Sequence, residues 1–124
     1  MPSMTKLVLA VDDEPDILEM LKIWLESYGY RVMTSENGRA ALQLFGEFGA
    51  DLVILDIMMP GMDGLEVLSN LKAEKKNVNL PVVMLTAKGD TKSIFEAQRL
   101  GATDFLMKPF EEKELARIIE SILK

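Results

Sequence analysis

Four short polar clusters in this sequence each follow an apolar run, and their residues are of the types that bind a divalent cation and a phosphoryl group. The clusters are Asp12-Asp13, Asp56, Thr86-Ala87 and Lys108-Pro109. Three carboxylates that crowd together repel one another and resist ionisation. A hard divalent cation relieves this repulsion, and a set of oxygen ligands suits Mg²⁺ or Mn²⁺. The sequence therefore predicts a cation site at Asp12, Asp13 and Asp56.

A cation at this point, together with the ammonium of Lys108, would form a pocket for a dianionic phosphoryl group. Thr86 adds a hydroxyl donor, and the backbone amide of Ala87 adds another donor. Charge stabilisation and positioning are nearly all that phosphoryl transfer requires. Because the chain contains no His and no Cys, the expected nucleophile is a carboxylate oxygen. Asp56 is the best candidate, since it ends a central strand and faces both the acidic pair and the lysine.

Each of these residues also has a simpler structural interpretation. An Asp after a strand often forms a turn or caps a helix, and Asp12-Asp13 could cap the helix that starts near Pro15. Thr86 could bond to the backbone, and Lys108 could be a solvated charge. The functional interpretation is favoured because all four clusters fall at the same edge of the expected sheet.

The elements that position these residues follow from the pattern of apolar side chains. Five short runs, rich in β-branched residues and bounded by Asp, Gly or Pro, are typical of strands. They are Lys6–Val11, Arg31–Thr34, Leu52–Leu55, Val82–Thr86 and Asp104–Met107. Helical patterns alternate with them, which predicts an α/β fold: a doubly wound parallel sheet with five strand–helix units. In such sheets the functional crevice lies at the carboxyl ends of the strands.

The five helices are indicated by apolar stripes with helical spacing. Pro15 suits the first turn of the first helix, Asp63 suits the cap of the third, and Gly29 and Gly101 suit helix ends. The stripes are Ile17, Leu21, Trp24 and Tyr28; Ala41, Leu44, Phe45 and Phe48; Leu65, Leu68 and Leu71; Ile94, Ala97 and Leu100; and Leu115, Ile118, Ile119 and Ile122.

Composition narrows the classes of function. The 124 residues suit one domain, and 48% hydrophobic residues supply a sizeable core. The absence of Cys and His excludes disulfides, thiolate or imidazole zinc sites and Ser–His catalysis. A net charge of −6 disfavours direct binding to nucleic acid. The start of the chain lacks the pattern of a signal peptide, and no run approaches membrane-spanning length, so we expect a cytoplasmic protein with no membrane association.

Four stretches together give the chain a family resemblance. They are VLAVDDEP, DLVILDIMMPGMDG, PVVMLTA and GATDFLMKPF. In this order and spacing the sequence resembles the receiver domain of bacterial two-component response regulators over essentially its whole length. The resemblance implies a single receiver domain over residues 1–124, with a flavodoxin-like sheet in the strand order 2-1-3-4-5.

The resemblance also implies a role for individual residues. Asp56 would be the phospho-acceptor, and Lys108 would sense the acyl phosphate. The Lys108–Pro109 bond would be cis. Asp13 would bind Mg²⁺ directly and Asp12 mainly through water, with the backbone carbonyl of Met58 as a further ligand. Thr86 and Phe105 would form a switch pair, and Gly61 and Gly64 would shape the loop after Asp56.

The implied function is that of a signalling switch. A sensor histidine kinase or a histidine phosphotransfer protein would supply the phosphoryl group. The surface around the fourth helix, fifth strand and fifth helix would then signal to a downstream protein or an attached effector domain. Such a protein catalyses only its own phosphorylation and dephosphorylation.

Two alternative functions remain open. The first is a Mg²⁺-dependent phosphatase, an enzyme class that usually has a second Asp where Met58 stands. The second is a pseudo-receiver that only binds partners, a class that typically lacks one of the acidic residues or the lysine.

Overall fold

The structure, a computed structural model, describes residues 5–124; the first four residues of the expected domain, 1–4, lie outside the described residues. Five strands form one parallel sheet in the order β2-β1-β3-β4-β5, which confirms the predicted flavodoxin-like topology. They are β1 (Leu7–Val11), β2 (Arg31–Ser35), β3 (Leu52–Asp56), β4 (Val82–Thr86) and β5 (Asp104–Met107). Each predicted run was therefore correct to within one residue at either end.

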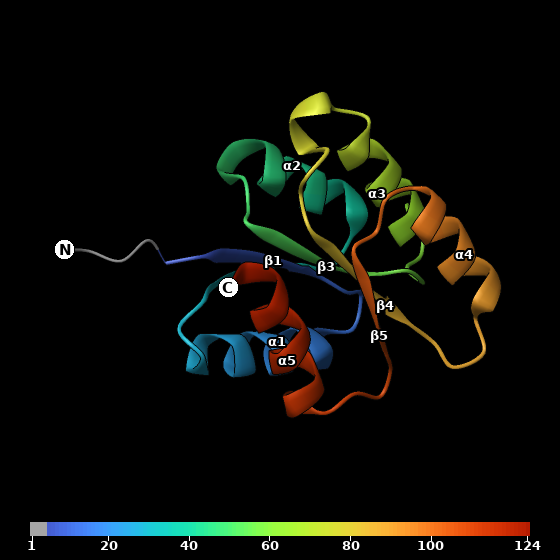
Figure 1. The fold of residues 1–124 in the computed structure, drawn as a ribbon. Coiled ribbons are helices and arrows are strands. Elements are labelled where there is room, and N and C mark those ends of the chain that lie inside the picture. The colour runs from blue at the N-terminus through green and yellow to red at the C-terminus, as the bar shows by residue number, and fades with distance from the viewer. Residues whose placement is uncertain (1–4) are drawn as a thin grey trace.

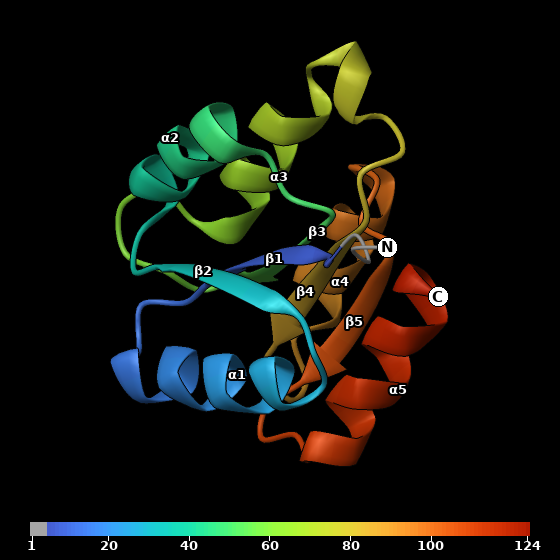
Figure 2. The ribbon, with the colours of Figure 1, turned by 90° about the vertical axis from the view of Figure 1, so that its left-hand side faces the viewer.

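Helices cover both faces of this sheet (Figures 1 and 2). One face carries α1 (Pro15–Ser27) and α5 (Glu112–Leu123). The other carries α2 (Gly38–Phe48), α3 (Gly64–Lys72) and α4 (Thr91–Arg99), with a short 3₁₀ helix, η1 (Lys75–Asn77), after α3. None of the described helices is both long and apolar enough to span a membrane.

The core therefore has two layers, one on each side of the sheet. Every residue of β3 and β4 is buried, because these central strands have helices above and below them. Leu9, Leu55 and Met84 belong to the layer under α2, α3 and α4. Ile54 and Leu85 belong to the layer under α1 and α5.

Local sequence signals set the helix ends as predicted. Pro15 is the first residue of α1, where its missing N–H costs nothing. Asp63 caps α3 in a capping box with Glu66, each side chain accepting a bond from the other residue's backbone amide. Gly29 and Gly101 follow α1 and α4 with φ of +95° and +104°, a region that favours glycine.

Two of the predicted helix stripes were partly wrong. Phe48 was placed on the core stripe of α2 but is 59% exposed, because it is the last residue of the helix and lies beyond the packed part. In α1 the fully packed residues are Leu18, Leu21 and Leu25. Tyr28 caps the end of that helix instead and donates a hydrogen bond to Glu112 in α5.

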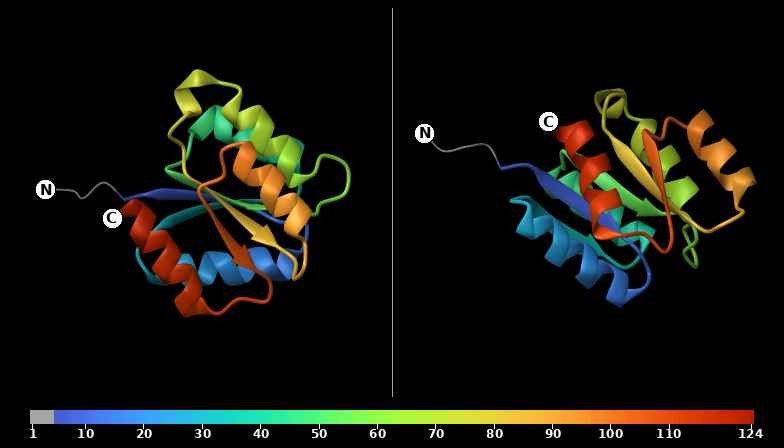
Figure 3. Two further views of the ribbon diagram at one scale, coloured as in Figure 1. Left: turned by 45° about the vertical axis from the view of Figure 1, so that its right-hand side comes forward. Right: turned by 60° about the horizontal axis from the view of Figure 1, so that its bottom comes forward.

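The carboxyl ends of β1, β3, β4 and β5 lie at one edge of the molecule, from which the loops to the following helices leave (Figure 3). The four polar clusters singled out in the sequence are therefore at neighbouring positions.

Candidate functional site

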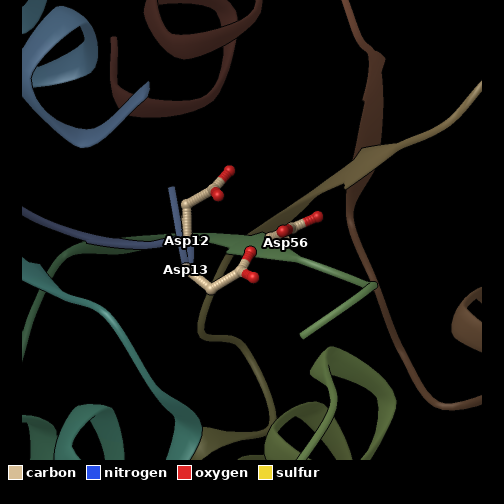
Figure 4. Close-up of side chains that lie close together, drawn as sticks. All are labelled: Asp12, Asp13 and Asp56. Carbon is tan, nitrogen blue, oxygen red and sulfur yellow. The ribbon is translucent and has the colours of Figure 1, made fainter. Parts of the chain in front are cut away.

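Three carboxylates converge at the ends of β1 and β3 (Figure 4). Asp12 and Asp13 follow β1 directly, and Asp56 is the last residue of β3. One oxygen of each lies within 4.8 Å of the others. Asp12 is 0% exposed and Asp56 is 4% exposed, whereas Asp13 is half-buried, so two of the three carboxylates are removed from water. This is the acidic group that the sequence predicted.

The alternation of side chains along the strands explains why these residues meet. In a strand every second residue faces the same side. Asp12 lies two residues after Ala10, and Asp56 lies two residues after Ile54. Ala10 and Ile54 belong to the layer under α1 and α5, so both Asp side chains face that side of the sheet. Since β1 and β3 are neighbours in register, the two carboxylates leave the sheet side by side.

Lys108 brings a positive charge to the same point from the end of β5. Its Nζ lies 2.8 Å from Asp12 Oδ2 and 3.4 Å from Asp56 Oδ2. Burial opposes the charge on the ammonium, but the contact with Asp12 and the negative charge of Asp56 outweigh it and hold the pKa of Lys108 above its usual value. The peptide bond between Lys108 and Pro109 is cis, as the resemblance implied.

The ionisation of Asp56 is disfavoured in the protein alone. Burial, and after it the negative charge of Asp12, raises the pKa of Asp56 from 3.8 to about 7. Lys108 and the backbone amide of Met58, which lies 3.4 Å from Asp56 Oδ1, act in the opposite direction without cancelling the shift. A bound cation would favour the ionised form.

The residues present fit such a cation. Asp12 uses Oδ1 to accept a hydrogen bond from the amide of Glu14 at 2.9 Å. Its buried Oδ2 has no hydrogen-bond donor among the described residues, since Lys108 is close but wrongly angled for a hydrogen bond. A buried oxygen without a donor costs free energy, which a hard cation held by three carboxylates would recover.

The capping interpretation of the acidic pair is only partly correct. Asp12 does form the turn into α1 through its bond to the Glu14 amide. However, the N-cap residue of α1 is Glu14, and its side chain makes no capping hydrogen bond. Capping therefore leaves Asp13 and the second oxygen of Asp12 unexplained.

The remaining predicted residues lie around this cluster without joining it. Thr86 is buried, and alternation along β4 places it on the face of Met84, away from the side that carries Asp12 and Asp56. Its carbonyl accepts a hydrogen bond from the amide of Lys108 at 2.8 Å. Ala87 is exposed after β4. Phe105 is partly buried against the layer under α2, α3 and α4, on the same face as Thr86.

Two further residues act on the cluster. Glu14, which the sequence indicates only as part of a helix start, accepts a hydrogen bond from Lys108 Nζ at 3.2 Å. Its position directly after the acidic pair was the signal that could have identified it. Gly64 begins α3 so close to β3 that a Cβ at this position would lie 2.2 Å from the carbonyl oxygen of Asp56. Only glycine lets the loop after Asp56 close in this way.

Comparison with known proteins gives consistent matches over nearly the whole chain. Residues 8–120 match the response regulator receiver domain. The chain is 37% identical over 119 residues to the phosphate regulon transcriptional regulatory protein PhoB of Pseudomonas aeruginosa, and 40% identical over 124 residues to the DNA-binding response regulator MtrA of Mycolicibacterium smegmatis. These matches cover 96% and 100% of this chain but 52% and 53% of the relatives. The chain thus spans about half the length of the curated relatives that it matches.

Solved structures of similar length have the same fold. A putative response regulator from Chloroflexus aurantiacus superposes with a TM-score of 0.91 at 35% identity, covering 97% of this chain and 98% of that one. The chemotaxis protein CheY4 of Vibrio cholerae gives a TM-score of 0.91 at 32% identity, covering 96% of this chain and 99% of that one.

Proposed function

The chain belongs to the response regulator receiver domain family, and on that basis we propose that it accepts a phosphoryl group on Asp56 in a reaction that depends on a divalent cation. One observation carries this proposal. The Asp56 carboxylate lies within 4.8 Å of two further carboxylates and 3.4 Å from the ammonium of Lys108. Together these groups supply a nucleophile, ligands for a cation and a fixed positive charge.

In the proposed reaction an oxygen of Asp56 attacks the phosphorus of a phosphohistidine. The new O–P bond forms as the P–N bond breaks, and the imidazole nitrogen keeps the electron pair. Lys108 contacts the phosphoryl oxygens, and the amide of Ala87 donates to them. A Mg²⁺ or Mn²⁺ ion held by Asp12, Asp13, Asp56 and the carbonyl of Met58 would neutralise the charge that gathers on these oxygens.

Removing a ligand carboxylate tests the cation site. Mg²⁺ should raise the melting temperature of the wild type, because the ion binds the native state and not the unfolded chain. Asp13→Asn should lose most of this increase. Asp16→Asn, which removes one charge from the first turn of α1, should keep it. The measurement is thermal unfolding with EDTA and with increasing Mg²⁺. Equal Mg²⁺ responses in wild type and Asp13→Asn would contradict the proposed ligand.

Thr86 and Phe105 are proposed to pass the signal on. When the Thr86 hydroxyl turns toward a phosphoryl group on Asp56, it vacates space on the face that it shares with Phe105, and the ring can fill it. The surface of α4, β5 and α5 would change as a result. Exposed apolar residues already lie there, since Phe95 in α4 and Met107 in β5 are both largely in contact with solvent.

The switch predicts a specific pattern of chemical shifts. Beryllofluoride, an analogue of the phosphoryl group, should shift the NMR signals of Phe105 and α4 in the wild type. In Thr86→Ala these distant shifts should fall by half or more, while shifts at Asp13 and Asp56 remain. If the wild-type shifts stay confined to the carboxylate cluster, Thr86 and Phe105 do not form a switch.

We also propose the partners and the extent of the domain. A sensor histidine kinase or a histidine phosphotransfer protein donates the phosphoryl group in the cytoplasm. Residues 1–124 act as one receiver domain that signals to a downstream protein or an attached effector domain. PhoB and MtrA are named as a transcriptional regulator and a DNA-binding regulator and are about twice as long as this chain. DNA binding in a longer regulator would then belong to the effector, since this chain has a net charge of −6.

A further inference from the structure

Lys108 holds a position between three carboxylates, and only one of the three contacts is a hydrogen bond. Its Nζ lies 2.8 Å from Asp12 Oδ2, 3.2 Å from Glu14 Oε1 and 3.4 Å from Asp56 Oδ2. The geometry suits hydrogen bonding only in the contact with Glu14. Among the three contacts, the one with Glu14 therefore has hydrogen-bond geometry, although Asp12 is nearer and Asp56 is the proposed acceptor.

Glu14 differs from the other two carboxylates in its surroundings. Its side chain is 62% exposed, whereas the side chains of Asp12 and Asp56 are buried. It does not belong to the acidic cluster whose oxygens lie within 4.8 Å of one another, so it is not among the candidate cation ligands. Its carboxylate can therefore hold Lys108 without also being bound to a cation.

The side chain of Glu14 has no part in starting the helix. The residue is the N-cap of α1, but its side chain makes no capping bond. Its contribution to the helix is its backbone carbonyl, which accepts hydrogen bonds from the amides of Ile17 and Leu18. Its backbone amide donates to Asp12. All these contacts survive a change of carboxylate to amide, so the side chain can be altered without disturbing the fold.

From this arrangement we infer that Glu14 is a positioning residue that holds the ammonium of Lys108 in the unphosphorylated state and competes with a phosphoryl group on Asp56 for it. The inference rests on the proposed function. An ammonium has three N–H donors. When phosphoryl oxygens bind, the donor that bonds to Glu14 must break that hydrogen bond or share it with them. Glu14 thereby favours the resting state and lowers the affinity of the site for a phosphoryl group.

The competition predicts a gain of affinity when the charge of Glu14 is removed. At saturating Mg²⁺, Glu14→Gln should bind beryllofluoride about two- to fivefold more tightly than wild type, the factor expected for loss of one partly exposed ion pair. Asp16→Asn is the matched control, because it removes one negative charge from the first turn of the same helix, and Asp16 forms no ion pair with Lys108 among the described residues. Its affinity for beryllofluoride should be unchanged.

A second measurement reports on Lys108 directly in the metal-free protein. The ¹⁵Nζ signal of Lys108 should shift in Glu14→Gln and stay in place in Asp16→Asn, with both variants melting close to wild type. An affinity for beryllofluoride in Glu14→Gln that equals or falls below that of Asp16→Asn would overturn the inference. If wild type itself fails to bind beryllofluoride in Mg²⁺, the proposed function fails first, and the two failures are thereby distinguished.

Discussion

Asp56→Asn should abolish phosphorylation of this protein by acetyl phosphate in Mg²⁺, while wild type gains one alkali-labile phosphoryl group. The amide oxygen of Asn is a much weaker nucleophile than a carboxylate, and it also weakens the cation site. No other group can replace it easily, because the chain has no His and no Cys. Asp12 also lies close to Lys108, but it is 0% exposed and one of its oxygens already accepts a hydrogen bond from the amide of Glu14. Intact-mass analysis measures the result.

The control for this loss is a carboxylate outside the site. Asp16→Asn should be phosphorylated to the same extent as wild type, because it leaves all three carboxylates of the cluster unchanged. If wild type and Asp56→Asn are labelled equally, Asp56 is not the acceptor.

Lys108→Met should keep the nucleophile but slow the phosphorylation by tenfold or more, which is about 1.4 kcal/mol of transition-state stabilisation.

In the absence of metal, Asp56 should make the protein less stable as the pH rises from about 4 to about 7. Its pKa is raised from 3.8 to about 7 by burial and by Asp12, so the folded protein holds a proton that the unfolded chain has released. Holding this proton stabilises the folded protein. The stabilisation is complete below the pKa of Asp56 in the unfolded chain, and it is lost as the pH rises through the pKa of Asp56 in the folded protein. Asp56→Asn cannot ionise and should escape this loss.

The expected difference is large for a single side chain. Relative to wild type, Asp56→Asn should gain on the order of 2 kcal/mol in free energy of unfolding between about pH 5 and about pH 8. Urea unfolding with EDTA measures it, and comparing the two proteins cancels the titration of all other groups. Mg²⁺ should reduce the difference, because the ion binds the ionised carboxylate. Parallel stability curves for the two proteins would contradict a raised pKa for Asp56.

The sequence was informative wherever a residue's role depends on its place in a regular element. Strand alternation and the shared edge of a parallel sheet bring Asp12, Asp56 and Lys108 together, and these follow from the order of apolar and polar residues. The same alternation places Thr86 on the opposite face of the sheet, which it shares with Met84. The bond from Lys108 to Glu14 could not be predicted, because it depends on the rotamers of two long side chains. The exposure of Phe48 depends on where α2 stops packing, which an apolar stripe does not show.

The close approach of Gly64 to Asp56 fixes the start of α3 against the end of β3. The start of α3 touches the carbonyl of the acceptor residue and donates a hydrogen bond from Gly64 to Ile57 at 2.9 Å, so α3 and the end of β3 are one rigid part. The proposed switch through Thr86 and Phe105 would instead move α4. A sensor built on this protein would therefore place its reference label on α3 and its reporter on α4.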